Sequence, residues 1–151
     1  MITVGVISDT HGLLRPEVFD CLQGCQHIIH AGDIGSPEII AELENIAPLN
    51  IIRGNVDKAD WAKKIPATDF FQIDKTTIYC LHNLQHLDLD PKAAELDLVI
   101  SGHTHQPALF EKDGVSFLNP GSIGPRRFSY PISMAKIYLN DEQFNVEFIS
   151  F

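Results

Sequence analysis

The first third of the chain alternates short apolar runs with helical patterns. The apolar runs at residues 2–8, 27–31 and 49–53 each end in a polar turn, which is typical of buried strands. Between them, Pro16 and the pair Ser36-Pro37 favour helix starts, because proline is compatible with the first turn of a helix. An alternation of strands and helices predicts a parallel sheet of the α/β class.

The remaining two thirds of the chain are richer in strand patterns. Three pairs of segments flank turn sequences and therefore predict three β-hairpins: residues 68–73 with 76–81, 109–111 with 115–118, and 133–139 with 144–149. The last of these hairpins would turn at Asn140-Asp141. We also expect a strand over residues 98–101 and a short helix over residues 91–96, capped by Asp90 or Asp88. Together these elements predict two sheets with helices outside them, a layered sandwich in a single domain spanning residues 1–151.

Composition narrows the class of protein. The 151 residues carry 20 acidic and 11 basic side chains, and the net charge of -9 argues against an extended nucleic-acid surface. No apolar run approaches the ~18 residues of a membrane span, and the N-terminus lacks the pattern of a signal peptide. Three cysteines without paired spacing predict neither a disulfide framework nor a zinc finger. We expect a cytoplasmic protein that does not bind a membrane.

Residues that commonly bind metals follow the predicted strands or end them. In open α/β sheets, ligands bind at the carboxyl ends of the strands, so we expect these side chains to meet at one edge. Asp9 and His11 are two residues apart, and an extended backbone would point both side chains the same way. The predicted metal-ligand set is Asp9, His11, Asp33, Asn55, His82, His103 and His105.

The chemistry of this set suits two divalent cations. Asp33 has two carboxylate oxygens and can bridge two ions, while Asn55 offers a neutral carbonyl oxygen. Two divalent cations bring more positive charge than two carboxylates and one hydroxide remove. The remaining positive charge can hold an anionic phosphate. Two ions about 3.5–4 Å apart can also generate hydroxide at neutral pH. Mixed imidazole and carboxylate ligands favour Mn, Fe, Co, Ni or Zn over Mg or Ca.

Five stretches carry a resemblance to a known family, and they run in family order across nearly the whole chain. The chain resembles the calcineurin-like metallophosphoesterases, and within them the small bacterial and archaeal phosphodiesterases. The matching stretches are Ser8-Asp9-Thr10-His11-Gly12, His30-Ala31-Gly32-Asp33-Ile34, Gly54-Asn55-Val56-Asp57, Ser101-Gly102-His103-Thr104-His105 and Asn119-Pro120-Gly121-Ser122.

The resemblance implies a four-layer αββα sandwich of two mixed sheets flanked by helices. It also implies a phosphodiesterase in which hydroxide bound between two divalent metals attacks a small phosphoester, with Mn²⁺ expected first and Ni²⁺, Co²⁺, Fe²⁺ or Zn²⁺ as alternatives. We interpret Asp33, Asn55 and His82 as catalytic. The implied division places Asp9, His11, Asp33 and His105 on one metal, and Asp33, Asn55, His82 and His103 on the other. A homodimer or larger homo-oligomer stays open.

Two positions depart from the family pattern. Many members have histidine where this chain has Val56, and there it assists the leaving group. Its replacement favours diesters with good leaving groups, and a phosphomonoesterase is the alternative. Asn83 follows His82 where glycine is usual, and it either reaches substrate or caps the turn. A non-catalytic scaffold like the retromer subunit with this fold is a further alternative, although all seven ligand positions are filled here.

Several other polar residues are assigned structural or open roles. We interpret His30 as a satisfied strand histidine and Asp57 as a side chain that holds the Asn55 loop. Arg126 and Arg127 are equally compatible with a phosphate grip and with a solvated or subunit surface.

Overall fold

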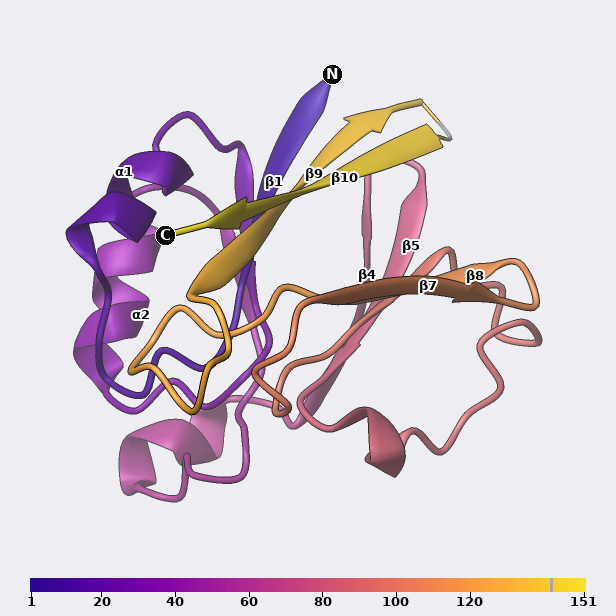
Figure 1. Cartoon of the computed structure of the whole chain (residues 1–151). Coiled ribbons are helices and arrows are strands. Elements are labelled where there is room, and N and C mark those ends of the chain that lie inside the picture. Colours follow the sequence, from indigo (N-terminus) through magenta and orange to yellow (C-terminus); the bar gives the residue numbers. More distant parts are fainter. Residues whose placement is uncertain (142) are drawn as a thin grey trace.

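The computed structural model describes residues 1–141 and 143–151 and contains two five-stranded mixed sheets packed face to face (Figure 1). The first sheet has the order β10-β9-β1-β2-β3, in which β1 pairs in parallel with β2 and antiparallel with β9. Its strands are β1 (Ile2–Ile7), β2 (His27–His30), β3 (Leu49–Ile51), β9 (Ser133–Asn140) and β10 (Gln143–Ser150).

The second sheet has the order β4-β5-β6-β8-β7, with parallel pairs at β5–β6 and β6–β8. Its strands are β4 (Thr68–Ile73), β5 (Thr76–Leu81), β6 (Leu98–Ile100), β7 (Ala108–Lys112) and β8 (Val115–Asn119). The two mixed sheets confirm the predicted fold class, and all three predicted hairpins form. Asn140 is the last residue of β9 and pairs with Gln143 of β10. Residue 142 lies outside the described residues, so only part of the predicted last turn is observed.

Apolar side chains on alternating strand positions supply a core on each face of the first sheet. Val4, Val6 and Ile29 point inward and pack against Ile78 and Ile100 of the second sheet. The neighbouring positions of the first sheet, including Ile7 and Ile28, point outward and pack under the helices α1 (Pro16–Leu22) and α2 (Pro37–Glu44). The two helices lie together on that outer face in Figure 1.

An irregular segment covers the outer face of the second sheet. The 3-10 turn η2 (Leu84–His86) and the turns up to Leu96 pack their leucines against Tyr79 and Phe117. Among the described residues, this layer contains no α-helix, so the short helix predicted over residues 91–96 is wrong. Asp90 does accept hydrogen bonds from backbone N–H groups, as predicted, but Glu95 has a left-handed backbone (φ 59°) that ends any helical path.

The described helices are short. Besides α1 and α2 there is the 3-10 helix η1 (Asp60–Lys64), which precedes β4. No helix in the described ranges is long and apolar enough to cross a membrane.

Candidate metal centre

Loops from both sheets meet at the carboxyl ends of the parallel strands. Asp9 and His11 follow β1, Asp33 follows β2, and Asn55 lies beyond β3. From the second sheet, His82 directly follows β5. His103 and His105 follow β6. The placement of all seven residues at strand ends therefore follows the prediction.

Five of the seven side chains converge on shared space. Asp9, His11 and His105 form one group whose potential ligand atoms all lie within 4.8 Å of one another, and Asp9, Asp33 and His82 form a second. Nε2 of His105 lies 3.3 Å from Oδ1 of Asp9. Nε2 of His82 lies 3.1 Å from Oδ2 of Asp33. That same Asp33 oxygen lies 3.6 Å from Nε2 of His11, so Asp33 stands between the two sets of imidazoles.

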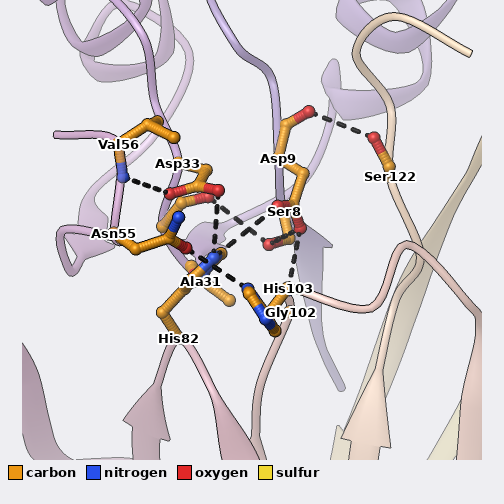
Figure 2. Close-up of polar contacts among 12 residues, drawn as sticks. Ser8, Asp9, Ala31, Asp33, Asn55, Val56, His82, Gly102, His103 and Ser122 are labelled. Atoms are coloured by element: carbon orange, nitrogen blue, oxygen red, sulfur yellow. Dashed lines mark hydrogen bonds and ion pairs between the residues drawn. The ribbon is translucent and has the colours of Figure 1, made fainter. Parts of the chain in front are cut away.

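Asn55 and His103 face each other beside this cluster. Oδ1 of Asn55 lies 3.2 Å from Nδ1 of His103, and the His103 ring packs edge-on against His82 with a centroid separation of 5.3 Å. Figure 2 shows this pair next to Asp33 and His82. Both side chains are exposed, whereas Asp9, Asp33, His82 and His105 are buried. Neither close group includes His103, and the implied division of ligands between two metals stays a prediction.

The backbone at the ligand positions is left-handed rather than extended. Asp9 has φ 58° and His11 has φ 47°. The expectation that strand-like alternation aligns these two side chains is therefore wrong, because β1 ends at Ile7 and the loop turns sharply. Left-handed φ values recur at Asp33, His103 and His105. Non-glycine residues adopt this region rarely, and such strain clusters at functional sites.

Several buried polar atoms at the centre lack a hydrogen-bond partner. They are Asp9 Oδ1, His11 Nε2, His82 Nε2 and His105 Nδ1. Buried nitrogen and oxygen atoms without partners are rare in proteins because the lost hydration is costly. Their mixture of carboxylate oxygen and imidazole nitrogen is a donor set that transition-metal cations prefer. The residues present therefore fit the binding of divalent cations.

Neighbouring groups orient the acidic and imidazole ligands. The Ser8 hydroxyl donates to Oδ2 of Asp9 at 2.6 Å, and the backbone N–H of His103 reaches the same oxygen at 3.2 Å (Figure 2). This leaves Oδ1 of Asp9 free to face the centre. Nδ1 of His82 lies 2.7 Å from the carbonyl of Ala31, so it donates there and presents Nε2 as a lone pair. The sequence pattern assigned no role to Ser8 or Ala31, because such contacts depend on loops that meet only in space.

Asp57 clamps two loops of the site together. Its carboxylate accepts hydrogen bonds from the backbone N–H groups of Ile34, Gly35 and Gly54, at distances of 2.8 to 3.0 Å. The structural role predicted for Asp57 is confirmed, and it extends beyond its own loop to the loop that carries Asp33. The backbone N–H of Val56 donates to Oδ1 of Asp33 at 3.1 Å.

Electrostatics at the centre favour charged carboxylates. Burial alone would raise the pKa of Asp9, but the neighbouring imidazoles and the Ser8 hydroxyl outweigh it and hold that pKa far below its usual value. Burial also opposes the charging of Asp33 and His82. Their mutual contact nevertheless lowers the pKa of Asp33 and raises the pKa of His82. Protonation of His82 at low pH occupies the Nε2 lone pair that a cation would use, so cation binding should weaken at low pH.

Other predicted residues have structural contacts. His30 is fully buried, accepts from the N–H of Gly32 at 3.1 Å and pairs with the Thr10 hydroxyl at 3.0 Å, as expected for a satisfied strand histidine. Arg126 donates to the carbonyl of Tyr130 within its own exposed loop. Asn83 caps η2 by accepting from the N–H of Gln85.

Two grooves open beside the centre. One, of about 480 Å³, is lined by Arg53, Asn55, His82, Asn83 and His86 among others. The second, of about 630 Å³, runs from His103 and Thr104 toward β7. His103 and Asn83 border both grooves, so Asn83 lies where it can reach a ligand as well as cap its turn.

The fold and the clustered carboxylates and imidazoles define a class of metal-binding phosphoesterases. The chain belongs to the calcineurin-like phosphoesterase superfamily, whose family model matches residues 2–142. It is 36% identical to a probable metallophosphoesterase of Methanothermobacter thermautotrophicus, over 97% of this chain and 91% of that protein. It is 33% identical to a phosphodiesterase of Methanocaldococcus jannaschii, over 78% of this chain and 82% of that protein.

A solved structure of Vps29 from Entamoeba histolytica, in complex with Zn²⁺, shares the fold. Its TM-score is 0.77 at 23% identity, with 99% of both chains covered. At this identity, the likeness concerns the fold alone.

Proposed function

We propose that the protein is a metal-dependent phosphodiesterase. The observation that carries this proposal is the convergence of two buried carboxylates and three imidazoles beside two open grooves, with buried atoms of Asp9 and of the three imidazoles left without hydrogen-bond partners. The phosphodiesterase relative in Methanocaldococcus jannaschii supports the diester as the substrate class.

Two divalent cations are proposed, with Mn²⁺ expected first. Asp9, His11 and His105 would hold one of them, His82, Asn55 and His103 the other, and Asp33 would bind both. When bound, such cations supply Lewis acidity, which lowers the pKa of water and neutralises charge on a phosphate.

The residues of the chain prepare the site for that chemistry. Ser8 and the N–H of His103 fix the Asp9 carboxylate, and the Ala31 carbonyl holds His82 in the tautomer that exposes Nε2. Asn55 and His103 are exposed at the rim, where their side chains can contact a phosphate oxygen. Since these groups are oriented before substrate arrives, little reorganisation is needed during reaction.

The direct test removes Asp33. Asp33→Ala should lower the metal content of Mn-loaded protein below two ions per chain and abolish hydrolysis of a bis(nitrophenyl) phosphate. Asp20→Ala is the matched control, because Asp20 is an exposed aspartate of α1 and is not among the proposed ligands. Metal content is measured by elemental analysis and turnover by nitrophenolate release. Near-normal turnover in Asp33→Ala would refute the proposal.

Val56 bears on the choice between diesters and monoesters. Its side chain is 46% exposed, and only its backbone N–H contacts Asp33, so the side chain offers no proton to a leaving group. We therefore expect faster turnover of a nitrophenyl diester than of the monoester. Val56→His has room at this exposed position and should speed hydrolysis of diesters with poor alkyl leaving groups. A preference of the wild-type protein for monoesters would favour the phosphomonoesterase alternative.

The scaffold alternative rests on the shared fold with Vps29. It predicts no metal-dependent turnover. If Mn- or Ni-loaded protein hydrolyses none of these esters above background, and chelation changes nothing, the scaffold interpretation replaces the enzyme.

A further inference from the structure

The larger groove has an aromatic wall. Phe110 of β7 stacks on Phe117 of β8 with an interplanar angle of 3° and a centroid separation of 4.9 Å. Phe117 is only 8% exposed, whereas Phe110 is 48% exposed. One face of the Phe110 ring is therefore covered by Phe117, and much of the rest of the ring is open to solvent. An exposed aromatic ring held by a buried one is a rigid stacking surface.

This wall is continuous with the proposed metal centre. The groove is lined at one end by His103 and Thr104 of the ligand loop, and at the other by Phe110 and Phe117. Phe110 also borders a neighbouring hollow that is lined by Leu87 and Leu89 among others. A substituent on a phosphate bound at His103 would therefore extend along the groove toward the stacked rings.

Among the described residues that line the groove, His103 has the only titratable side chain. The lining residues include no aspartate, glutamate, lysine or arginine, although the chain as a whole carries a net charge of -9. The polar lining consists of amides such as Asn83, Gln85 and Gln106, which can donate and accept hydrogen bonds. A neutral, planar group with hydrogen-bonding edges matches such walls in both charge and shape.

We propose that this groove binds a planar aromatic substituent of the phosphodiester, of the nucleobase type, by stacking on Phe110. The proposal rests on the phosphodiesterase function and names the class of substrate. Base stacking on an aromatic side chain strengthens binding by roughly tenfold or more.

The test uses two methyl diesters that differ only in the base. These are the methyl ester of adenosine monophosphate and the methyl ester of ribose 5-phosphate, assayed with Mn-loaded protein by methanol release. The nucleotide ester should show a kcat/KM roughly tenfold higher, as expected for one stacked base. Phe110→Ala should bring the ratio close to one, and Phe110→Tyr should preserve it.

Leu109→Ala is the matched control. Leu109 is the neighbouring residue on β7 and is 47% exposed. Phe110 lines the larger groove and Leu109 does not, although both border a further hollow with Phe144 and Val146. It should leave the ratio unchanged. An equal effect of both variants would attribute the change to damage of the edge strand and overturn the proposal.

A binding measurement separates this proposal from the function on which it rests. By calorimetry, adenosine monophosphate should bind Mn-loaded protein about tenfold more tightly than ribose 5-phosphate, and Phe110→Ala should remove the difference. If neither methyl ester nor bis(nitrophenyl) phosphate is hydrolysed but this difference in binding holds, the phosphodiesterase proposal fails and the aromatic subsite stands. If both esters are hydrolysed equally and the ligands bind equally, the subsite alone is refuted. The subsite is likewise refuted if Phe110→Ala merely dissociates an oligomer, since the stacked pair then belongs to a subunit interface.

Discussion

The two ends of the strands use the same unusual backbone torsion for different purposes. At the hairpin end, Asp74 (φ 52°) and Asp113 (φ 54°) are left-handed and exposed in turns. At the opposite end, Asp9 and Asp33, both with φ 58°, are left-handed and buried. Aspartate tolerates this region better than most residues, so both ends employ it.

The difference lies in what holds each residue there. A hairpin turn needs a left-handed residue for its own local geometry. At the metal centre, the two loops hold each other. The N–H of Asp9 donates to the Gly32 carbonyl at 2.9 Å, and the N–H of His11 donates to the Asp33 carbonyl at 3.0 Å. The torsion of each ligand residue thus depends on the loop opposite, so damage to one loop should disturb the ligands on the other.

The largest expected effect is at Asp57, which joins the two loops. Asp57→Ala leaves three backbone N–H groups without their carboxylate, and we expect a loss of about 3 kcal/mol in the free energy of unfolding. Metal content should fall as well, although Asp57 is not a proposed ligand. Chemical denaturation and elemental analysis measure the two effects. Asp60→Ala, at an exposed aspartate paired only with Lys63, is the control. A stable, fully metallated Asp57→Ala would show that the loops do not depend on each other.

Gly102→Ala should have the next largest effect. A Cβ atom at this position would collide with the Ser8 hydroxyl and come within 2.8 Å of Oδ2 of Asp9. We expect a loss of about 2 kcal/mol from overpacking, together with weaker Mn²⁺ binding, because the Asp9 carboxylate must shift. Gly114→Ala, in the hairpin turn between β7 and β8, has open space around its Cβ but a strained φ of 80°. It should cost stability while leaving the Mn²⁺ affinity, measured by titration, unchanged.

His30, which lies beside the metal centre, should make the stability of the folded protein sensitive to acid. Burial lowers the pKa of His30 to about 4, below the ordinary value of 6.5, so the folded protein holds the neutral ring. Between pH 4 and pH 6.5, the unfolded chain therefore binds more protons at His30 than the folded protein does. The stability from His30 is therefore complete above about pH 6.5 and falls as the pH drops toward 4.

The matching experiment compares wild type with His30→Gln. Between pH 7 and pH 5, wild type should lose about 2 kcal/mol more stability than the variant, measured by denaturation in metal-free buffer. Parallel pH profiles for the two proteins would contradict the assignment of His30 as a buried neutral residue.

The smallest effect is expected at the hairpin end. Asp74→Gly retains access to the left-handed region, so stability should change by no more than about 0.5 kcal/mol, and metal content should stay the same. Circular dichroism during thermal unfolding and elemental analysis suffice to check it. A loss of metal in this variant would mean that the two ends are coupled and that their difference is not as local as the contacts indicate.

Most strands could be predicted from the sequence because their apolar positions repeat with a clear period. The hairpin of β4 and β5 has the predicted bounds, since Asp74-Lys75 separates two well-defined runs. The segment over residues 91–96 was not predictable in the same way. Its alanines and leucine are compatible with a helix, but Glu95 adopts a left-handed torsion and Leu96 packs under the outer face of the second sheet.

By itself, the sequence determined the family, the order of the strands along the chain and the seven candidate ligands, because each of these is written in local residue types and spacing. Only the tertiary structure decided how the ligand atoms face one another. The left-handed loops, the Ser8 and Ala31 contacts and the Asp57 clamp join residues that are distant in sequence. The stacked Phe110 and Phe117 likewise depend on the register of β7 against β8. Such contacts are set by the mutual packing of loops and strands, which no local pattern encodes.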